Sequence, residues 1–318
     1  MTSESSKLAF NDGWQYSPAP ESTDHIVIDE QYGLFIDNEF VEPAEGQYFD
    51  TINPATEELL ASVALATDAD VIRAVKAARK AKNGAWSKMK PADRGKYIYR
   101  IARLLQERAR EFSVIESLDG GKPIRESRDI DIPLSAAHFF YYAGWADKLD
   151  YAFPGRTSKP LGVVGQVIPW NFPLLMAAWK IAPALACGNT VVLKPAETTP
   201  LTAMKLAEVI RDAELPPGVV NFVTGAGDTG ASIVNHPDVD KIAFTGSTEV
   251  GRIIQQSIAG TGKRYTLELG GKAANIIFAD AAIDQAVEGI VNGIFFNQGH
   301  VCCAGSRLLV QESVADEV

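Results

Sequence analysis

The feature that most constrains the fold is a regular alternation of short apolar segments with helical segments between residues 161 and 270. The apolar segments have the length and composition of buried strands, and the residues between them have helical spacing. This alternation predicts a doubly wound α/β fold, in which helices cover both faces of a parallel sheet. Because such sheets bind ligands at the carboxyl ends of their strands, functional residues are expected there. The predicted strands are 162–168, 190–193, 219–223, 241–244 and 265–269.

The rest of the sequence suggests a division into segments around this sheet. Residues 1–30 are polar and irregular and are interpreted as an N-terminal extension. Residues 31–144 are expected to join 161–270 in one domain, with 145–160 as a short connecting segment. Residues 271–318 then begin a second α/β domain, for which the pattern predicts a strand, a helix and a strand at 275–278, 283–296 and 308–311.

Within the first segment, the sequence predicts one hairpin and three helices. Asp37-Asn38 is typical of the turn of a hairpin over 34–41. Thr67 or Asp68 is expected to cap the first helix. Apolar residues at helical spacing predict a second helix and a third, over 92–118 and 132–145, and Gly120-Gly121 would end the second.

Composition excludes several classes of protein. The net charge of −10 makes nucleic-acid binding and binding to anionic lipid unexpected. Three cysteines are too few for a disulfide framework, and the first residues lack the apolar core of a secretory signal, which favours a reduced, cytoplasmic protein. The longest apolar run, 172–193, is interpreted as a helix, a turn and a strand, not as a membrane span, because it is broken by Pro173, Lys180, Pro183 and Asn189.

Two of the three cysteines, Cys302 and Cys303, lie in one loop between a helical segment and an apolar strand. This is a suitable place for a reactive thiol, although a free cysteine is more often an inert small hydrophobe. His300 suggests a Cys–His pair. Residues two positions apart do not face each other by default, however, and the partners of such a pair are normally distant in sequence. Cys302 is therefore the candidate nucleophile, and His300 receives no role.

Three motifs near expected strand ends could bind a nucleotide. Lys194 and Glu197 could hold sugar hydroxyls, although such residues in a loop are more often a solvated pair. FTGSTEVG at 244–251 offers free amides and the Ser247 hydroxyl to a phosphate, or is an ordinary helix cap. GAGDTG at 225–230 matches the dinucleotide pattern G-x-G-x-x-G, which is equally typical of a tight glycine turn.

Two further polar residues are candidates for catalysis. Glu268 lies in the apolar strand 265–269, and burial there would raise its pKa towards that of a general base. The alternative is an alternating strand in which Glu268 faces water. Asn171 lies between two prolines, and an amide held stiffly there could donate to an oxyanion. Alternatively, the Asn171 side chain only stabilises its own turn.

Taken together and in order, these motifs resemble the aldehyde dehydrogenase family. The resemblance covers residues 34–318, and the residues before it resemble the long, two-module branch of that family. It implies a Rossmann-like NAD-binding domain followed by the start of a catalytic domain. The motifs that carry it are VIPWNFP at 167–173, KPAE at 194–197, FTGSTEVG at 244–251, LELGGK at 267–272 and the Cys302 loop.

The resemblance implies a role for each candidate. Cys302 would attack an aldehyde to give a thiohemiacetal, and Asn171 with the Cys302 backbone amide would hold the oxyanion. After hydride transfer to NAD, Glu268 would activate the water that hydrolyses the thioester. Lys194 and Glu197 would hold the adenosine ribose, and a carboxylate there would repel the 2′-phosphate of NADP. The other implied NAD contacts are Ile168, Pro169, Trp170, Gly227, Phe244, Gly246, Ser247 and Leu269, and no metal ligand is implied.

The sequence departs from the family pattern at three points. His300 replaces a residue that is usually Gln, and 145–160 is short for the hairpin that builds the oligomer, which argues against a tetramer and leaves a homodimer open. The sequence also stops before the rest of the catalytic domain, so a truncated chain with little or no turnover is expected. The alternatives are a coenzyme A-acylating member, against which Glu268 argues, and a non-enzymatic dehydrogenase-like module, against which Cys302, Asn171 and Glu268 together argue.

Overall fold

The computed structural model describes residue 23 and residues 26–156 and 158–318, so most of the predicted extension 1–30 lies outside the described residues. A seven-stranded sheet has the order β10-β9-β6-β7-β8-β2-β3, and its five strands from the predicted alternation are parallel. These are β6 (Val163–Val167), β7 (Thr190–Lys194), β8 (Val220–Phe222), β9 (Lys241–Gly246) and β10 (Arg264–Leu269). The predicted parallel sheet is therefore confirmed.

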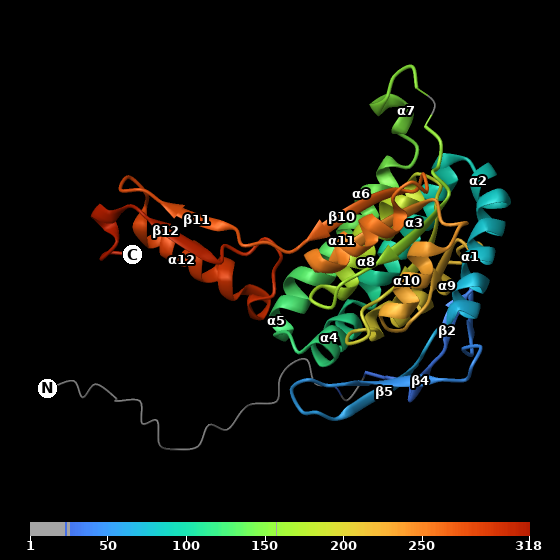
Figure 1. Ribbon diagram of the computed structural model, residues 1–318, viewed down its shortest axis with the longest axis horizontal. Helices are drawn as coiled ribbons and strands as arrows, with labels where there is room; N and C mark the ends of the chain where they lie inside the picture. Colours follow the sequence, from blue (N-terminus) through green and yellow to red (C-terminus); the bar gives the residue numbers. More distant parts are fainter. Residues whose placement is uncertain (1–22, 24–25, 157) are drawn as a thin grey trace, which may run out of the picture.

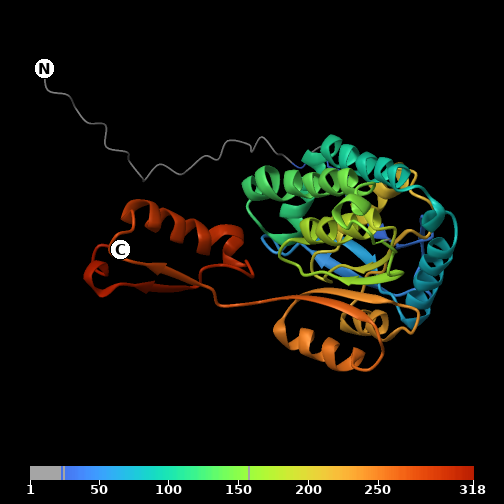
Figure 2. The same cartoon turned by 90° about the horizontal axis from the view of Figure 1, so that it is seen from above.

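Successive residues of the strands pack against helices on opposite faces, as expected of a buried parallel sheet. On β7, Val191 and Leu193 belong to one apolar cluster, and Val192 belongs to another. Figures 1 and 2 show the two helical layers. The first cluster contains α3 (Pro91–Glu107), α4 (Ala109–Gly120), α6 (Ile132–Trp145), α8 (Pro173–Ala186) and α9 (Leu201–Asp212); the second contains α1 (Asp68–Asn83), α10 (Gly227–Asn235) and α11 (Thr248–Ile258).

The predicted hairpin turn at Asp37-Asn38 and the predicted helix cap at Thr67 are confirmed. The hairpin of β2 (Leu34–Ile36) and β3 (Glu39–Val41) turns at Asp37 and Asn38, both with positive φ, as its tight turn requires. At α1, the Asp70 carboxylate accepts from the Thr67 backbone amide at 3.0 Å in a capping box.

The predicted helix over 92–118 is wrong as a single element, because it breaks at Arg108 (φ −99°, ψ 14°) into α3 and α4. The Arg108 guanidinium binds Glu111 and, on α9, Glu208, so the break lets α4 pack against α9. Gly121, at φ 70°, ends α4 as a left-handed cap. A single turn of π-helix, Ser127–Asp131, precedes α6.

A second, three-stranded sheet was not predicted. It contains β1 (Gln31–Tyr32), β5 (Leu59–Ala64) and β4 (Tyr48–Ile52), in that order. Between α6 and β6, α7 (Leu149–Ala152) projects from the body of the molecule (Figure 1). None of the described helices is both long and apolar enough to cross a membrane.

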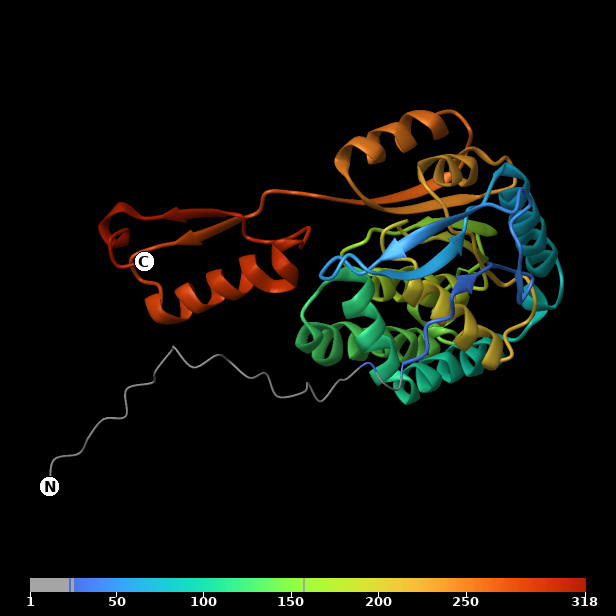
Figure 3. The same cartoon turned by 90° about the horizontal axis from the view of Figure 1, so that it is seen from below.

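Residues 274–318 form a small lobe, which stands beside the sheet domain in Figures 1, 2 and 3. Its strands β11 (Ala274–Ile277) and β12 (Arg307–Val310) pair in parallel, and α12 (Ile283–Phe295) connects them through the Cys302 loop. The predicted strand, helix and strand are confirmed. After β12, the chain forms a short 3-10 turn, Glu312–Val314.

Candidate functional site

The parallel sheet brings most of the predicted nucleotide-binding residues to one edge. Strands β10, β9, β6 and β7 are neighbours, so their carboxyl ends are adjacent. In the register of the sheet, Val167 pairs with both Lys194 and Phe244, and Leu269 pairs with Gly246. The turn that contains Asn171 follows β6 directly. The strand-end residues therefore assemble because of the fold, although they are distant in sequence.

Lys194 is buried, which distinguishes it from the solvated lysine of the alternative interpretation. Its ammonium donates to the Glu197 carboxylate at 3.0 Å and to the Pro195 carbonyl at 3.1 Å. Burial lowers the pKa of Lys194, against the attraction of Glu197. Burial tends to raise the pKa of Glu197, but a hydrogen bond from its own backbone amide and the Lys194 ammonium together hold that pKa below its usual value. The exposed Glu197 carboxylate keeps its position at the strand end.

The turn after β9 is a helix cap in this structure. The Ser247 hydroxyl accepts from the Val250 amide at 3.2 Å, as the cap interpretation expected. A β-carbon at Gly246 would lie 2.5 Å from the Phe244 ring, and one at Gly251 would lie 2.6 Å from the Leu269 side chain. Both glycines thus leave room for the side chains of Phe244 and Leu269 to pack closely against the turn.

The glycine pattern at 225–230 forms a tight turn. At Gly225, φ is 153°, and a β-carbon would lie 2.2 Å from the Thr229 hydroxyl oxygen. That hydroxyl donates to the Ala66 carbonyl at 2.8 Å, so the turn is fastened to the chain before α1. Gly227 begins α10, and Gly230 lies against the Lys194 stem, where a β-carbon would be 3.6 Å from Lys194 Cδ. The glycine motif that matches the dinucleotide pattern therefore packs against the side chain of Lys194.

The Cys302 loop has an unusual backbone. Three consecutive residues, Asn297, Gln298 and Gly299, have left-handed φ values of 50°, 58° and 77°. For residues other than glycine this conformation is strained, and such strain persists only where surrounding contacts enforce it. Cys302 itself is exposed, and partial burial followed by the neighbouring Cys303 raises the pKa of its thiol.

Asn171 provides the contacts that enforce this loop. Its side-chain amide donates to the His300 carbonyl at 2.7 Å. Its own carbonyl accepts from the Asn297 side chain and from the Lys122 ammonium, each at 2.8 Å. The Trp170 and His300 rings meet edge to face, with 4.8 Å between their centroids. The structure thus joins Asn171 to the loop of Cys302 and gives the His300 backbone a contact that sequence reasoning did not assign.

Glu268 is exposed on β10, so the alternating-strand interpretation describes it and the expected burial was wrong. Its charge still acts on a neighbouring group. Burial lowers the pKa of the Lys180 ammonium, and the negative charge of Glu268 partly opposes that change. The chain after β10 then passes the Cys302 loop, and a β-carbon at Gly271 would lie 3.6 Å from the Cys302 carbonyl oxygen. Glu268 therefore belongs to the same region, without a direct side-chain contact to Asn171 among the described residues.

Lys180, Lys122 and Asn297 are polar residues of this region that sequence reasoning missed. The Lys180 ammonium donates to the Thr245 hydroxyl of β9 at 2.7 Å, and burial lowers its pKa to about 8. The signal was present, since a lysine in the apolar run of α8 must find a polar partner.

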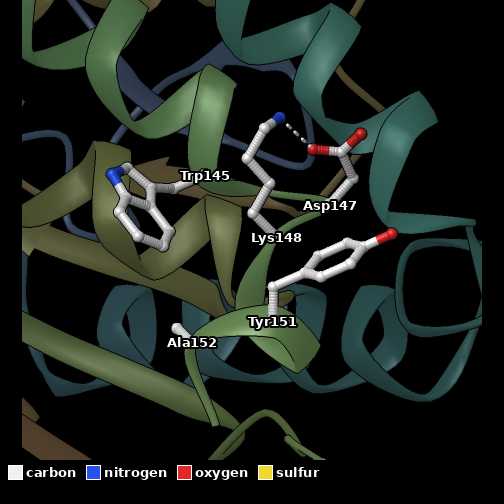
Figure 4. Close-up of a pocket in the computed structure, with 5 residues that line it drawn as sticks. All are labelled: Trp145, Asp147, Lys148, Tyr151 and Ala152. Carbon is white, nitrogen blue, oxygen red and sulfur yellow. Dashed lines mark hydrogen bonds and ion pairs between the residues drawn. The ribbon is translucent and has the colours of Figure 1, made fainter. Parts of the chain in front are cut away.

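A pocket of about 610 Å³ lies elsewhere, where α6 and α7 meet. Figure 4 shows Trp145 and Tyr151 on either side of Lys148, whose ammonium pairs with Asp147 at 2.7 Å. None of its lining residues belongs to the site predicted from sequence.

Within the described ranges, no group of three or more His, Cys, Asp or Glu side chains is arranged to hold a metal ion.

Comparisons with known proteins show which family the sequence matches. The sequence profile of the aldehyde dehydrogenase family matches residues 40–318. An aldehyde dehydrogenase from Alternaria alternata is 51% identical, over 90% of this chain and 59% of its own length. Human retinal dehydrogenase 2 is 49% identical, over 89% of this chain and 57% of its own.

Solved structures give the same result. The NAD+ complex of an aldehyde dehydrogenase from Bacillus cereus superposes with a TM-score of 0.88 at 45% identity, and the match covers 91% of this chain and 61% of that one. The chain therefore spans about 60% of the length of the relatives that it matches.

Proposed function

Because this chain belongs to the aldehyde dehydrogenase family, we propose that it oxidises an aldehyde to a carboxylic acid with NAD, through a thioester on Cys302. One observation carries the proposal. Asn171, the candidate oxyanion donor, is hydrogen-bonded to the loop of Cys302 at 2.7 Å, at the sheet edge where Lys194 and Ser247 lie. Nucleophile, oxyanion donor and nucleotide-binding groups thus belong to one continuous region.

The strand-end residues fit NAD. The exposed Glu197 carboxylate, held by Lys194, can accept from both adenosine ribose hydroxyls, and its negative charge disfavours a 2′-phosphate at that position. Ser247 and the N-terminus of α11 can donate to the pyrophosphate. Ile168, Pro169 and Trp170 precede Asn171 in the turn after β6, and Gly227, Phe244, Gly246 and Leu269 complete the edge. When bound, NAD would supply a hydride acceptor.

The residues of the chain divide the reaction into two stages. In the first, the Cys302 thiolate forms a bond to the carbonyl carbon, and the carbonyl oxygen becomes an oxyanion held by the Asn171 side-chain amide and the Cys302 backbone amide. Loss of hydride from that carbon leaves a thioester. In the second stage, the Glu268 carboxylate takes a proton from water, whose oxygen attacks the thioester carbon and releases the acid and the thiolate.

The test is the covalent intermediate. The protein is incubated with NAD and a panel of aldehydes, and acylation is followed by intact-protein mass spectrometry and NADH absorbance. We expect a single acylation event, without sustained turnover, in the unchanged protein and in the matched control Cys303→Ser. In Cys302→Ser the adduct and NADH should fall by about a thousandfold or more, because loss of a nucleophile removes covalent catalysis. An adduct on Cys303, or NADH formation that survives Cys302→Ser, would refute the role of Cys302.

A second variant separates the two stages. In Glu268→Gln the acyl adduct should accumulate, because the amide cannot accept the proton of the attacking water. An adduct that is released only when coenzyme A is added, with formation of acyl-coenzyme A, would assign the protein to the acylating branch instead. Absence of both adduct and NADH with every aldehyde would support a non-enzymatic module.

We also infer a cytoplasmic location and, at most, a homodimer. All three cysteines are free thiols in the structure, which suits a reducing compartment.

The inference of a homodimer rests on the segment between α6 and β6. Among its described residues this segment contains only the short helix α7, with Tyr151 and Phe153 exposed. Light scattering on the purified protein tests the second inference, and a tetramer would contradict it.

A further inference from the structure

Two donors from different parts of the molecule meet at one backbone carbonyl. The Asn171 carbonyl accepts from the Lys122 ammonium and from the Asn297 side-chain amide, each at 2.8 Å. Lys122 follows α4 in the sheet domain, and Asn297 lies in the loop that leads to Cys302. A single peptide group therefore connects the interior of the sheet domain to the nucleophile loop.

The Lys122 ammonium is held rigidly. It is buried, and it donates to the Asp131 carboxylate at 2.5 Å, with a Glu116 carboxylate oxygen at 3.7 Å. It also lies 4.5 Å from the centroid of the Phe172 ring, in a cation–π contact. Glu116 in turn accepts from the Leu174 amide at 3.4 Å, at the start of α8. The carboxylates and the ring thus surround the ammonium, and they fix its direction towards the Asn171 carbonyl.

Such a cluster is a poor way to gain stability alone. Desolvation of buried charges offsets most of their attraction, and apolar residues of the same size would serve folding as well. Glu116 and Asp131 each retain one buried oxygen that has no hydrogen-bond partner among the described atoms. This cluster contacts the turn that contains Asn171 through the hydrogen bond from Lys122. Its location therefore indicates that it serves to position that turn.

We propose that Lys122 is a positioning residue: it anchors the Asn171 carbonyl and, with Asn297, keeps the oxyanion donor aligned with the Cys302 loop. This inference rests on the proposed function of Asn171 and Cys302. A fixed Asn171 carbonyl restricts the rotation of the peptide group and thereby the direction of the side chain. One N–H of that side chain is bound to the His300 carbonyl, so the second N–H of the amide is the one directed to an oxyanion.

The alignment can be tested without turnover by hydrogen–deuterium exchange. Lys122→Met removes the ammonium and keeps an apolar stem. Lys205→Met is the matched control, because Lys205 is similarly buried and pairs with Glu208 and Glu111 away from the site. Exchange at 168–172 and 297–302 should rise by about tenfold or more in Lys122→Met, since a charge-assisted hydrogen bond is lost. Lys205→Met should leave both segments unchanged, and Lys122→Arg should restore part of the protection.

A chemical readout separates positioning from general structure. Cys302 attack on p-nitrophenyl acetate forms an S–acyl bond, releases p-nitrophenolate and passes through an oxyanion, without a need for NAD. In Lys122→Met the acylation rate should fall by about tenfold to a hundredfold, as expected for a misaligned oxyanion donor. The affinity for NAD should change by less than about twofold, because the strand-end groups are untouched.

The outcomes separate this proposal from the proposed function. Exchange that is unchanged at both segments in Lys122→Met, or raised equally in Lys205→Met, would overturn the positioning role whatever the protein catalyses. Should Lys122→Met fail to fold, Asn297→Gly removes the second donor while glycine keeps the left-handed backbone, and it should raise exchange at both segments by about tenfold. Unchanged exchange in Asn297→Gly would overturn the proposal equally. An unchanged protein that is not acylated would count against the function alone.

Discussion

The sheet domain and the 274–318 lobe each supply one side of the candidate site, and they are built very differently. Strands β6 and β7 are almost entirely buried, with helices on both faces. In the lobe, by contrast, most of β12 is exposed, and α12 has no fully buried residue, with Phe295 exposed at 71%. The Lys194 side of the candidate site is thus formed by core packing, whereas the Cys302 side, among the described residues, depends on few contacts.

Those few contacts are concentrated at one junction. The Cys302 loop reaches the sheet domain through Asn171, through the Glu126 carboxylate, which accepts from the Asn297 amide at 2.8 Å, and through the Phe172 and Phe296 rings. Because the backbone at Asn297 is strained, these contacts must hold it in place. The comparison teaches that, among the described residues, the sheet domain positions the Cys302 loop by binding one short segment, 296–300.

The largest expected difference between the regions is in their contribution to stability. Phe222, which is fully buried on β8, and Phe295 on α12 are matched in chemistry. Phe222→Ala should lower the free energy of unfolding by about 3–5 kcal/mol, and Phe295→Ala by less than about 0.5 kcal/mol, since only the first leaves a cavity. Urea denaturation measures both. Equal losses would show that the lobe contains a core of its own.

A second difference concerns buried carboxyls. Burial raises the pKa of Asp119 on α4 to about 7, against hydrogen bonds from the Leu201 amide and the Thr51 hydroxyl. In the unfolded chain the pKa of Asp119 is about 3.9. Between about pH 4 and pH 7 the unfolded chain has therefore lost this proton while the folded protein still binds it, so the free energy of unfolding falls as the pH rises. Asp119 should contribute at most about 1.4 kcal/mol per pH unit to this decline, and Asp119→Asn should remove that part, while Glu116, whose pKa burial also raises to about 7, keeps its own contribution.

The matched control for this pH dependence is Asp284→Asn, since Asp284 is exposed in the first turn of α12. It should leave the dependence unchanged. Denaturation curves at a series of pH values provide the measurement. A decline of the same slope in the unchanged protein and in Asp119→Asn would show that another group is responsible.

The smallest expected effect is at helix ends. In the sheet domain, Ser247 caps α11, whereas α12 of the lobe begins after Ala282 without a side-chain cap. Ala282→Asp should therefore stabilise the lobe by about 1 kcal/mol, and Ser247→Ala should destabilise α11 by a similar amount. Amide exchange in the first turn of each helix reports both changes. No change in α12 would mean that its N-terminus is already satisfied in another way.

The sequence by itself determined much of the sheet domain. Strict alternation of strand and helix predicted the parallel sheet, and it placed Lys194, Gly246 and Leu269 at strand ends that the fold then brought together. Asp37-Asn38 and Thr67 marked their turn and cap correctly. These features follow from local rules, because periodicity, cap chemistry and positive φ depend on residues close in sequence.

Only the tertiary structure decided which distant groups meet. The Asn171 carbonyl receives a donor 49 residues before it and another 126 residues after it, and no local pattern relates these positions. The exposure of Glu268 and the helix break at Arg108 likewise depend on what packs beside them. The physical reason is that a buried polar group must find a partner, while the identity of that partner is set by how helices and strands stack.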